Sequence, residues 1–435
     1  MTLHTEAYRQ TPYWWDQVAP LTLPAPTPRR RVDVVIIGSG YTGLNAALET
    51  ALAGRDTLVL EAGEPGAGCS TRNGGQVSTG IKPSLAALAR KHGAARARAI
   101  HAEGTASLDW IGDFIRREGI DCDFRVSGRY HAAHSPRAFE ALAKSLARPD
   151  SGEDDGAYVV ARRDQRGELG SDTYHGGVVY PRHAALHPAK YHRGLLDRAL
   201  AAGAEIHANR AALAIKGQQG RFTVSTADGP VEARDVIVAT NGYTGNATPW
   251  LRRRVIPIGS YIIATEPLPP AMMDELFPTD RMVSDTRKVV YYYRASPDRT
   301  RVIFGGRVSS GETDPGVSGP KLYAEMVRLF PQLSGTRISH SWFGTVAYTF
   351  DDLMHTGQQA GVHYAMGYCG SGISMASYLG MRTGRRVLGL ADGASAFDDL
   401  PFPTRPLYTG RPWFLPAAVA WYRWQDNRAM KTKGA

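Results

Sequence analysis

The chain has 435 residues, of which 43% are hydrophobic and 21% charged, and this is typical of a globular protein with two cooperating domains. The formal net charge is +10, but apart from the arginine runs at 29–31 and 252–254 the basic residues are dispersed among acidic ones, so the clustered basic stripe of a nucleic-acid-binding surface is missing. Three scattered cysteines exclude a disulfide framework and a four-ligand zinc site. With no signal-peptide pattern and no apolar stretch of spanning length, we expect a cytoplasmic protein without a membrane span.

The first half of the chain begins with a proline-rich segment and continues into a βαβ unit. Residues 1–31 contain Pro20, Pro24, Pro26 and Pro28, and this composition predicts extended polyproline-like backbone rather than a helix or a sheet ladder. Residues 32–37 are a continuous β-branched apolar run, which predicts a strand buried on both faces of a parallel sheet. Residues 41–53, ended by Gly54, predict a helix, and residues 57–60 predict a second strand.

The remaining elements suggest a second domain with a different sheet. Helices are predicted at 86–119, 136–147 and 187–203, and strands at 178–181, 222–226 and 236–240. From residue 255 to 304 the strands become longer and alternate in polarity, most clearly at 261–265 and 289–293, which indicates an antiparallel sheet. A strand at 363–368 then leads through a glycine-rich turn into a helix at 374–390.

The turn after the first strand has the pattern of a dinucleotide site. Residues 38–43 match G-x-G-x-x-G, in which the glycines allow a tight turn, a close approach to a pyrophosphate and close helix packing. Glu61 ends the second strand, where its carboxylate can accept hydrogen bonds from ribose hydroxyls. The predicted cofactor residues here are Gly38, Gly40, Tyr41, Thr42, Gly43, Glu61 and Ala62.

A second glycine-rich segment at 66–76 distinguishes FAD from NAD, because it can line a longer cofactor with backbone amides. It resembles the FAD enzymes of the D-amino-acid oxidase, glycine oxidase and sarcosine oxidase superfamily, and within it the string Ser-Thr-Arg-Asn-Gly-Gly-Gln is similar to the γ-glutamylputrescine oxidoreductase branch. Three further stretches, 236–243, 303–307 and 348–373, extend the resemblance over nearly the whole chain. It implies FAD contacts from Ser70, Arg72, Asn73, Gly74, Gly75, Gln76, Thr240, Asn241, Gly242, Gly370, Ser371, Gly372 and Ile373.

We therefore predict the α/β class: a Rossmann-type FAD/NAD(P)-binding domain plus an α+β substrate domain with a large antiparallel sheet. The FAD-binding domain is expected to comprise residues 32–90, 180–250 and 345–395, and the substrate domain residues 91–179 and 251–344. Residues 1–31 are the lead-in, and residues 396–435 form a C-terminal segment. Independently of the resemblance, the turn at Gly370–Gly372 opens a helix whose N-terminal amides would favour negative charge on a reduced flavin.

The resemblance implies a flavin oxidase that takes a hydride from the carbon of a C–N bond in a small amine or amino acid, with oxygen or another acceptor. Candidates for the substrate cavity are Tyr292, Tyr293, Arg294, Arg307 and Trp342, with Tyr348 behind them. An arginine fork would hold a carboxylate, and aromatic rings would form apolar walls or bind a cation. Ordinary sheet packing remains an alternative for each of them.

Other residues give weaker signals, and some positions depart from the family. His131 with His134, and His183 with His187, lack a third ligand, so no metal site is predicted. Cys69 and Cys369 are expected to pack as small side chains rather than to bond flavin covalently. Relatives such as the sarcosine oxidases use one lysine near Ile303 and another near Ser374, and neither position is lysine here. Two alternatives therefore stay open: a dehydrogenase that passes electrons to a quinone or carrier, and a nucleotide-binding protein without turnover.

Overall fold

The first of two large sheets contains eight strands and carries the predicted βαβ unit. We describe a computed structural model that covers residues 2–24, 27–148, 156–309 and 314–431. At the centre of this sheet, β9, β3, β2, β12 and β19 lie side by side and run parallel, while β11 and β10 extend it antiparallel from the first half of β12. The strands are β2 (Arg31–Ile37), β3 (Thr57–Leu60), β9 (Glu205–His207), β10 (Ala214–Gln218), β11 (Arg221–Thr226), β12 (Gly229–Val238), β18 (His355–Gln359) and β19 (Val362–Met366).

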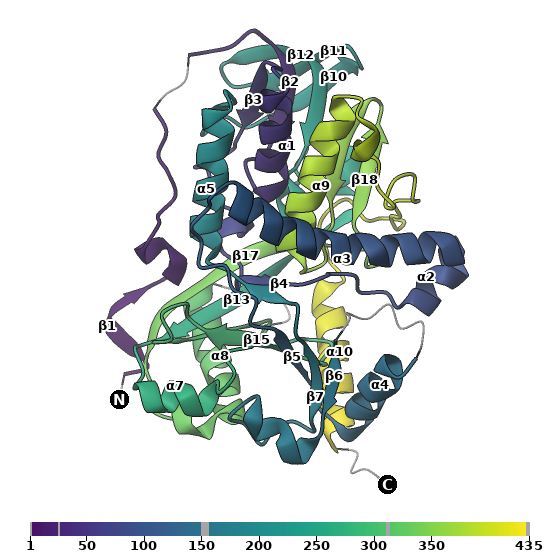
Figure 1. Cartoon of the computed structure of the whole chain (residues 1–435). Helices are drawn as coiled ribbons and strands as arrows, with labels where there is room; N and C mark the ends of the chain where they lie inside the picture. Colours follow the sequence, from purple (N-terminus) through teal and green to yellow (C-terminus); the bar gives the residue numbers. More distant parts are fainter. Residues whose placement is uncertain (1, 25–26, 149–155, 310–313, 432–435) are drawn as a thin grey trace.

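Helices α1, α5 and α9 pack beside this sheet in the upper part of Figure 1. The α1–α9 contact is close because Gly380 lies against the backbone of Thr42, where an added Cβ would come within 2.4 Å of the Thr42 carbonyl oxygen. The helices of this half of the molecule are α1 (Tyr41–Leu52), α2 (Leu85–His92), α3 (Ala94–Arg117), α5 (Pro188–Ala201), α6 (Pro249–Arg252) and α9 (Gly372–Val387).

The second sheet has nine strands in the order β1-β17-β13-β16-β15-β14-β5-β7-β6. Most neighbours are antiparallel, but β1 pairs parallel with β17 and β14 parallel with β5, so the sheet is mixed. Its strands are β1 (His4–Arg9), β5 (Arg129–Ala132), β6 (Tyr158–Val160), β7 (Gly177–Tyr180), β13 (Val255–Thr265), β14 (Met282–Asp285), β15 (Tyr292–Ala295), β16 (Val302–Gly306) and β17 (Ile338–Thr349). The helices α4 (Pro136–Leu146), α7 (Pro270–Leu276), α8 (Pro315–Leu329) and α10 (Leu415–Lys431) belong to this half.

The predicted fold class is confirmed, and three local predictions are wrong. The lead-in is not only extended surface chain, because residues 4–9 contain no proline and pair with β17, and Trp14 is fully buried. The helix predicted at 86–119 is two helices, because Gly93 at φ +82° breaks it. The strand predicted at 289–293 begins only at Tyr292, because the N–H groups of Val289 and Tyr291 donate to Asp426 and Asp285 instead of to a neighbouring strand.

The α3 helix lies wholly on the substrate-domain side of the predicted boundary between residues 90 and 91. That boundary assigns α3 to the substrate domain, yet α3 packs against α9, and its buried Ile100, Leu108 and Ile111 belong to the same core as α1 and β2. Two short strands, β4 (Gln76–Val77) and β8 (Ala184–Ala185), pair with each other between the two sheets. Among the helices of the described residues, none is both long and apolar enough to cross a bilayer.

Candidate functional site

A single cavity of about 1520 Å³ lies between the two halves and receives all three glycine turns. Its lining includes Gly40 from the first turn, Gly74 from the second and Ser371 from the third. The predicted convergence of these turns, which lie far apart in the sequence, is therefore what the structure shows. The cavity continues beyond them to side chains of the nine-stranded sheet and of α10.

The first turn is shaped by glycines that admit no side chain. Gly38 has φ +103°, and a Cβ on Gly43 would lie 1.8 Å from the Gly38 carbonyl oxygen. Gly43 itself does not line the cavity, so it acts by letting α1 approach the turn. At the start of α1, the Tyr41 N–H donates to the Ser70 hydroxyl at 3.1 Å, which joins the first glycine segment to the second.

Glu61 occupies the end of β3, where the sequence predicts a ribose contact. One carboxylate oxygen accepts hydrogen bonds from the Ser39 N–H at 2.9 Å and the Ser39 hydroxyl at 2.7 Å, and the other accepts from the Gly63 N–H at 3.1 Å. Glu61 and Ala62 both line the cavity. The carboxylate thus fixes the first turn and remains exposed to a ligand in the cavity.

Polar side chains of the second glycine segment make hydrogen bonds within the segment and so fix its shape. Arg72 donates from Nε to the Ala67 carbonyl at 2.7 Å and stacks on Trp15, with its guanidinium carbon 4.5 Å from the ring centre. The Asn73 amide donates to the Ser70 carbonyl and accepts from the Gly75 N–H, both at 2.9 Å. Ser70, Arg72, Asn73, Gly74 and Gln76 line the cavity, whereas Gly75 packs behind it against the Leu186 carbonyl.

Side-chain hydrogen bonds connect the region of the third turn to the residues that follow β12 and to those that follow the second glycine segment. The Asn241 side chain accepts from the Gly367 N–H at 2.9 Å, and the Ser374 hydroxyl donates to the Ser78 carbonyl at 2.6 Å. Thr240 and Asn241 line the cavity, but Gly242 packs against Thr345 instead. The residues of the turn and helix start that line the cavity are Gly370, Ser371, Gly372 and Ile373. They place the N-terminus of α9 at the cavity wall, where it favours negative charge.

Of the predicted substrate residues, Tyr292, Arg307 and Tyr348 line the cavity. The Tyr292 hydroxyl lies 2.7 Å from the Ser260 hydroxyl, and its ring packs so closely on Gly305 that a Cβ there would lie 2.3 Å from it. Burial raises the pKa of Tyr292, so the phenol stays neutral. Arg307 is buried and donates to the Gly259 carbonyl at 2.8 Å.

The prediction that Tyr293, Arg294 and Trp342 line the cavity is wrong. Tyr293 follows Tyr292 on β15, and because side chains alternate along a strand it faces the core of the nine-stranded sheet, where it donates to the Tyr174 hydroxyl. Arg294 instead donates to the carbonyls of Gly75 and Leu186, and the Trp342 indole donates to the Arg72 carbonyl at 2.9 Å. Arg294 and Trp342 therefore contact the second glycine segment on the side that faces away from the cavity.

Lys82 is a cavity residue that the sequence reasoning missed. Its ammonium donates to the Tyr348 hydroxyl at 2.9 Å and lies 4.0 Å from the centre of the Tyr348 ring. Burial lowers the pKa of Lys82, but the neighbouring Tyr348 more than offsets this and the pKa is raised, so the side chain stays cationic. Gly80, two residues earlier, packs on Ser371, which places Lys82 beside the third glycine turn. Lys82 has no motif of its own, so only the tertiary structure reveals it.

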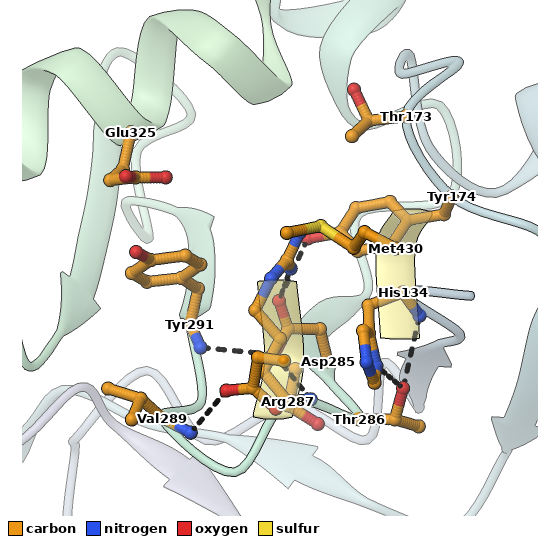
Figure 2. Close-up of polar contacts among 12 residues, drawn as sticks. His134, Thr173, Tyr174, Asp285, Thr286, Arg287, Val289, Tyr291, Glu325 and Met430 are labelled. Carbon is orange, nitrogen blue, oxygen red and sulfur yellow. Dashed lines mark hydrogen bonds and ion pairs between the residues drawn. The ribbon is translucent and has the colours of Figure 1, made fainter. Parts of the chain in front are cut away.

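The far end of the cavity is formed by the residues around Arg287, which the sequence reasoning also missed. Asp285 pairs with Arg287 in a buried ion pair and accepts hydrogen bonds from the Tyr174 hydroxyl at 3.3 Å and the Tyr291 N–H at 3.2 Å (Figure 2). His131, which also lines the cavity, lies 2.9 Å from the Ser284 hydroxyl, and burial together with Arg129 lowers its pKa to about 3. This histidine is therefore neutral in a strongly basic part of the cavity.

The cysteines that line the cavity, Cys69 and Cys369, are neutral thiols. Burial raises the pKa of Cys69 to about 12 and that of Cys369 to about 11, so both thiols are protonated at neutral pH. Within the described ranges, no group of three or more His, Cys, Asp or Glu side chains is arranged to hold a metal ion.

Comparisons with known proteins agree with this geometry. The family described as DAO, FAD dependent oxidoreductase, matches residues 33–386. The chain is 31% identical over 401 residues to gamma-glutamylputrescine oxidoreductase of Escherichia coli (strain K12), covering 91% of this chain and 93% of that protein. It is 30% identical over 396 residues to the probable oxidoreductase OrdL of Haemophilus influenzae, covering 89% and 90%. In fold it is similar to glycine oxidase from Geobacillus kaustophilus, with a TM-score of 0.69, 18% identity and coverage of 87% and 99%.

Proposed function

Because this chain belongs to the DAO family of FAD-dependent oxidoreductases, we propose that it oxidises the C–N bond of a small amine or amino acid. The observation that carries the proposal is the single cavity that three glycine turns line together with aromatic and basic side chains. The relative named gamma-glutamylputrescine oxidoreductase supports an amine substrate. Oxygen is the proposed acceptor, giving hydrogen peroxide, and the imine product would hydrolyse to an aldehyde or an oxo acid.

The residues of the glycine turns fit FAD, because a Cβ on Gly38, Gly40 or Gly74 would lie within 3.1 Å of a neighbouring atom, so that backbone forms the cavity wall there. Amides and hydroxyls from Gly40, Ser70 and Ser371 are the groups we assign to the cofactor. When bound there, FAD would supply a two-electron acceptor for the hydride on the carbon next to nitrogen. The N-terminus of α9 and the Lys82 ammonium would stabilise the negative charge that this transfer creates.

The remainder of the cavity suits a substrate with a neutral amine at one end and an anionic group at the other. Tyr292 and Tyr348 form the aromatic wall near the glycine turns. Further away, the lining carries the cations Arg129, Arg287 and Lys288, with Asp285 engaged by Arg287. A carboxylate would be attracted there, since arginine forks bind carboxylates in two-point contacts. We therefore expect amines that carry a carboxylate, such as γ-glutamyl amines, to be preferred over simple alkylamines.

The proposal is tested by an absorbance spectrum of the purified holoprotein while amines are added without oxygen. A panel of γ-glutamylputrescine, putrescine, sarcosine, glycine and proline should contain one compound that bleaches the flavin bands, with γ-glutamylputrescine the most effective. Admission of air should then restore the bands and release peroxide. Slow reoxidation in air combined with fast reoxidation by a soluble quinone would show that the protein acts as a dehydrogenase and not as an oxidase. Yellow protein that no amine bleaches would contradict the proposed catalysis.

A further inference from the structure

The outward side of α10 is an unusual surface for a helix that packs on a protein body. Trp421 and Trp424 are 54% and 49% exposed and stack on each other with their ring centres 4.8 Å apart. Trp413, just before the helix, is 70% exposed. We call the exposed residues on this side the tryptophan face: Trp413 before the helix, and Ala417, Ala420, Trp421, Trp424 and Arg428 on it, where 417, 421, 424 and 428 follow at intervals of three or four. Exposed aromatic side chains gathered on one helix face indicate a binding surface.

The opposite side of α10 packs against the protein body, so the tryptophan face cannot turn inward. Leu415 and Val419 pack with Val289, and Asp426 accepts hydrogen bonds from the N–H groups of Lys288 at 2.9 Å and Val289 at 3.1 Å. Arg423 donates to the Arg307 carbonyl at 2.9 Å. These contacts fix the rotation of the helix about its axis and hold the tryptophans towards solvent.

The C-terminal segment that carries the tryptophan face has an excess of basic residues. Between residues 400 and 431 the chain has five basic residues and a single acidic one, Asp426, which is buried in the contact just described. Arg405, Arg411 and Arg428 are exposed. The arginine run at 252–254, which the proposed reaction does not use, joins this surface, because Arg252 packs on Gly410 and the Arg253 carbonyl accepts from Thr404.

We propose that the tryptophan face docks α10 on the surface of an anionic lipid bilayer. Tryptophan favours the headgroup region, where its ring is half in apolar surroundings, and an interfacial helix presents such rings with flanking arginines. Anionic lipids supply the negative charge that this surface lacks. A protein partner or a second copy of this chain would have to bring acidic side chains to match it, and a second copy brings the same excess of arginine.

Docking at this helix has a consequence for the cavity, because Leu415, Ala418, Val419 and Tyr422 of α10 also line it. The helix that contacts lipid is therefore also a wall of the cavity.

The test is flotation of the full-length holoprotein with vesicles of phosphatidylcholine and phosphatidylglycerol at 7:3, and with phosphatidylcholine alone. We expect the protein to float with the anionic vesicles, and about fivefold weaker binding for each basic residue removed, as in Arg428→Ala. The double variant Trp421→Ala/Trp424→Ala should bind at least about tenfold more weakly. Leu52→Ala removes an apolar side chain that is 68% exposed at the end of α1 and is the matched control, expected to bind like the parent.

Each variant is first checked for its flavin spectrum and melting temperature, so that loss of binding is not loss of fold. Equal binding by the parent and the double variant, or no binding of the parent to either vesicle, would overturn the proposal. Sedimentation that shows a dimer for the parent and a monomer for the double variant, without vesicle binding, would instead assign the face to a contact between copies.

Discussion

The two ends of the cavity are built in opposite ways. The cofactor end is formed mainly by backbone, and its first turn requires glycines because Gly38 has φ +103° and a Cβ on Gly43 would collide with the Gly38 carbonyl. The rest of the cavity, from the third glycine turn to the far end, is formed by side chains, among them Lys82, Tyr292 and Arg287, which come from separate strands and loops. A backbone cradle requires particular residue types at fixed spacing, whereas a side-chain pocket tolerates many solutions.

This difference teaches which substitutions matter at each end. At the cofactor end a single methyl group should be disruptive, since the backbone has no freedom to move away. At the substrate end the removal of one charge or hydrogen bond should change rates or affinity while the fold persists. The following predictions test that contrast.

The largest effect is expected for Gly43→Ala. The added Cβ would lie 1.8 Å from the Gly38 carbonyl oxygen, so the turn or α1 must shift, with a loss of about 3 kcal/mol or more in unfolding free energy and loss of bound FAD. Urea unfolding and the ratio of flavin to protein absorbance measure both. Gly167→Ala, whose Cβ would meet nothing within 4 Å, is the control and should stay within about 0.5 kcal/mol of the parent. Full flavin content in Gly43→Ala would contradict the backbone cradle.

Glu61→Gln should weaken FAD binding by about 10- to 100-fold, because the charge-assisted hydrogen bonds to Ser39 and to the ribose lose about 1.5–3 kcal/mol. Titration of apoprotein with FAD, followed by flavin fluorescence, gives the Kd. Glu64→Gln, three residues on and outside the cavity lining, should bind FAD like the parent. Similar losses in both variants would show that the effect is not specific to the predicted ribose contact.

Acid should destabilise the substrate end through His131. Its pKa is lowered from 6.5 to about 3 by burial, so below pH 6.5 the unfolded chain binds a proton that the folded chain does not, and stability falls as pH falls. Between pH 7 and 5 this histidine should account for about 2 kcal/mol. The loss of unfolding free energy over that interval, measured in urea, should be smaller by this amount in His131→Gln. An identical pH dependence in the two proteins would exclude this role.

Lys82→Met should lower kcat by about tenfold while FAD stays bound, since a cation beside the flavin end would stabilise the charge that develops in the reaction. Stopped-flow measurement separates the reductive from the oxidative half-reaction and shows which one slows. Lys216→Met, at an exposed position of β10 in the eight-stranded sheet, should keep the kcat of the parent. If Lys82→Met loses flavin instead, Lys82 serves the cradle and not the reaction.

The smallest effect is expected for Asp426→Asn. The change weakens the hydrogen bonds that the Asp426 side chain accepts from the N–H groups of Lys288 and Val289 by about 1 kcal/mol. Because Lys288 and Val289 line the cavity, KM should rise a few-fold with little change in kcat. Steady-state kinetics measure both constants. The neighbouring exposed Asn427→Ala should leave them unaltered. A fall in kcat alone would disconnect α10 from substrate binding.

The sequence alone determined the cofactor end. The strand at 32–37, the turn at Gly38–Gly43 and the acid at Glu61 follow one another within 30 residues, and their spacing reflects local steric requirements that any chain must satisfy to make this turn. The glycine turns around residues 74 and 371 also carry local signals, and their convergence with the first turn followed from the resemblance to a known family. Gly43, Gly75 and Gly242 were identified as cofactor residues, although they act by close packing and not by lining the cavity.

Only the tertiary structure decided the substrate end. Because side chains alternate along a strand, Tyr293 faces the core. Arg294 and Trp342 donate hydrogen bonds to backbone carbonyls of the second glycine segment. Lys82 reaches the cavity from a loop that has no motif. The physical reason is that a side chain takes its role from the partners that long-range packing brings to it, and those partners lie hundreds of positions away, as Lys82 and Tyr348 do. The first glycine turn, by contrast, is shaped by its immediate neighbours in the chain, as the close contact between Gly43 and Gly38 shows.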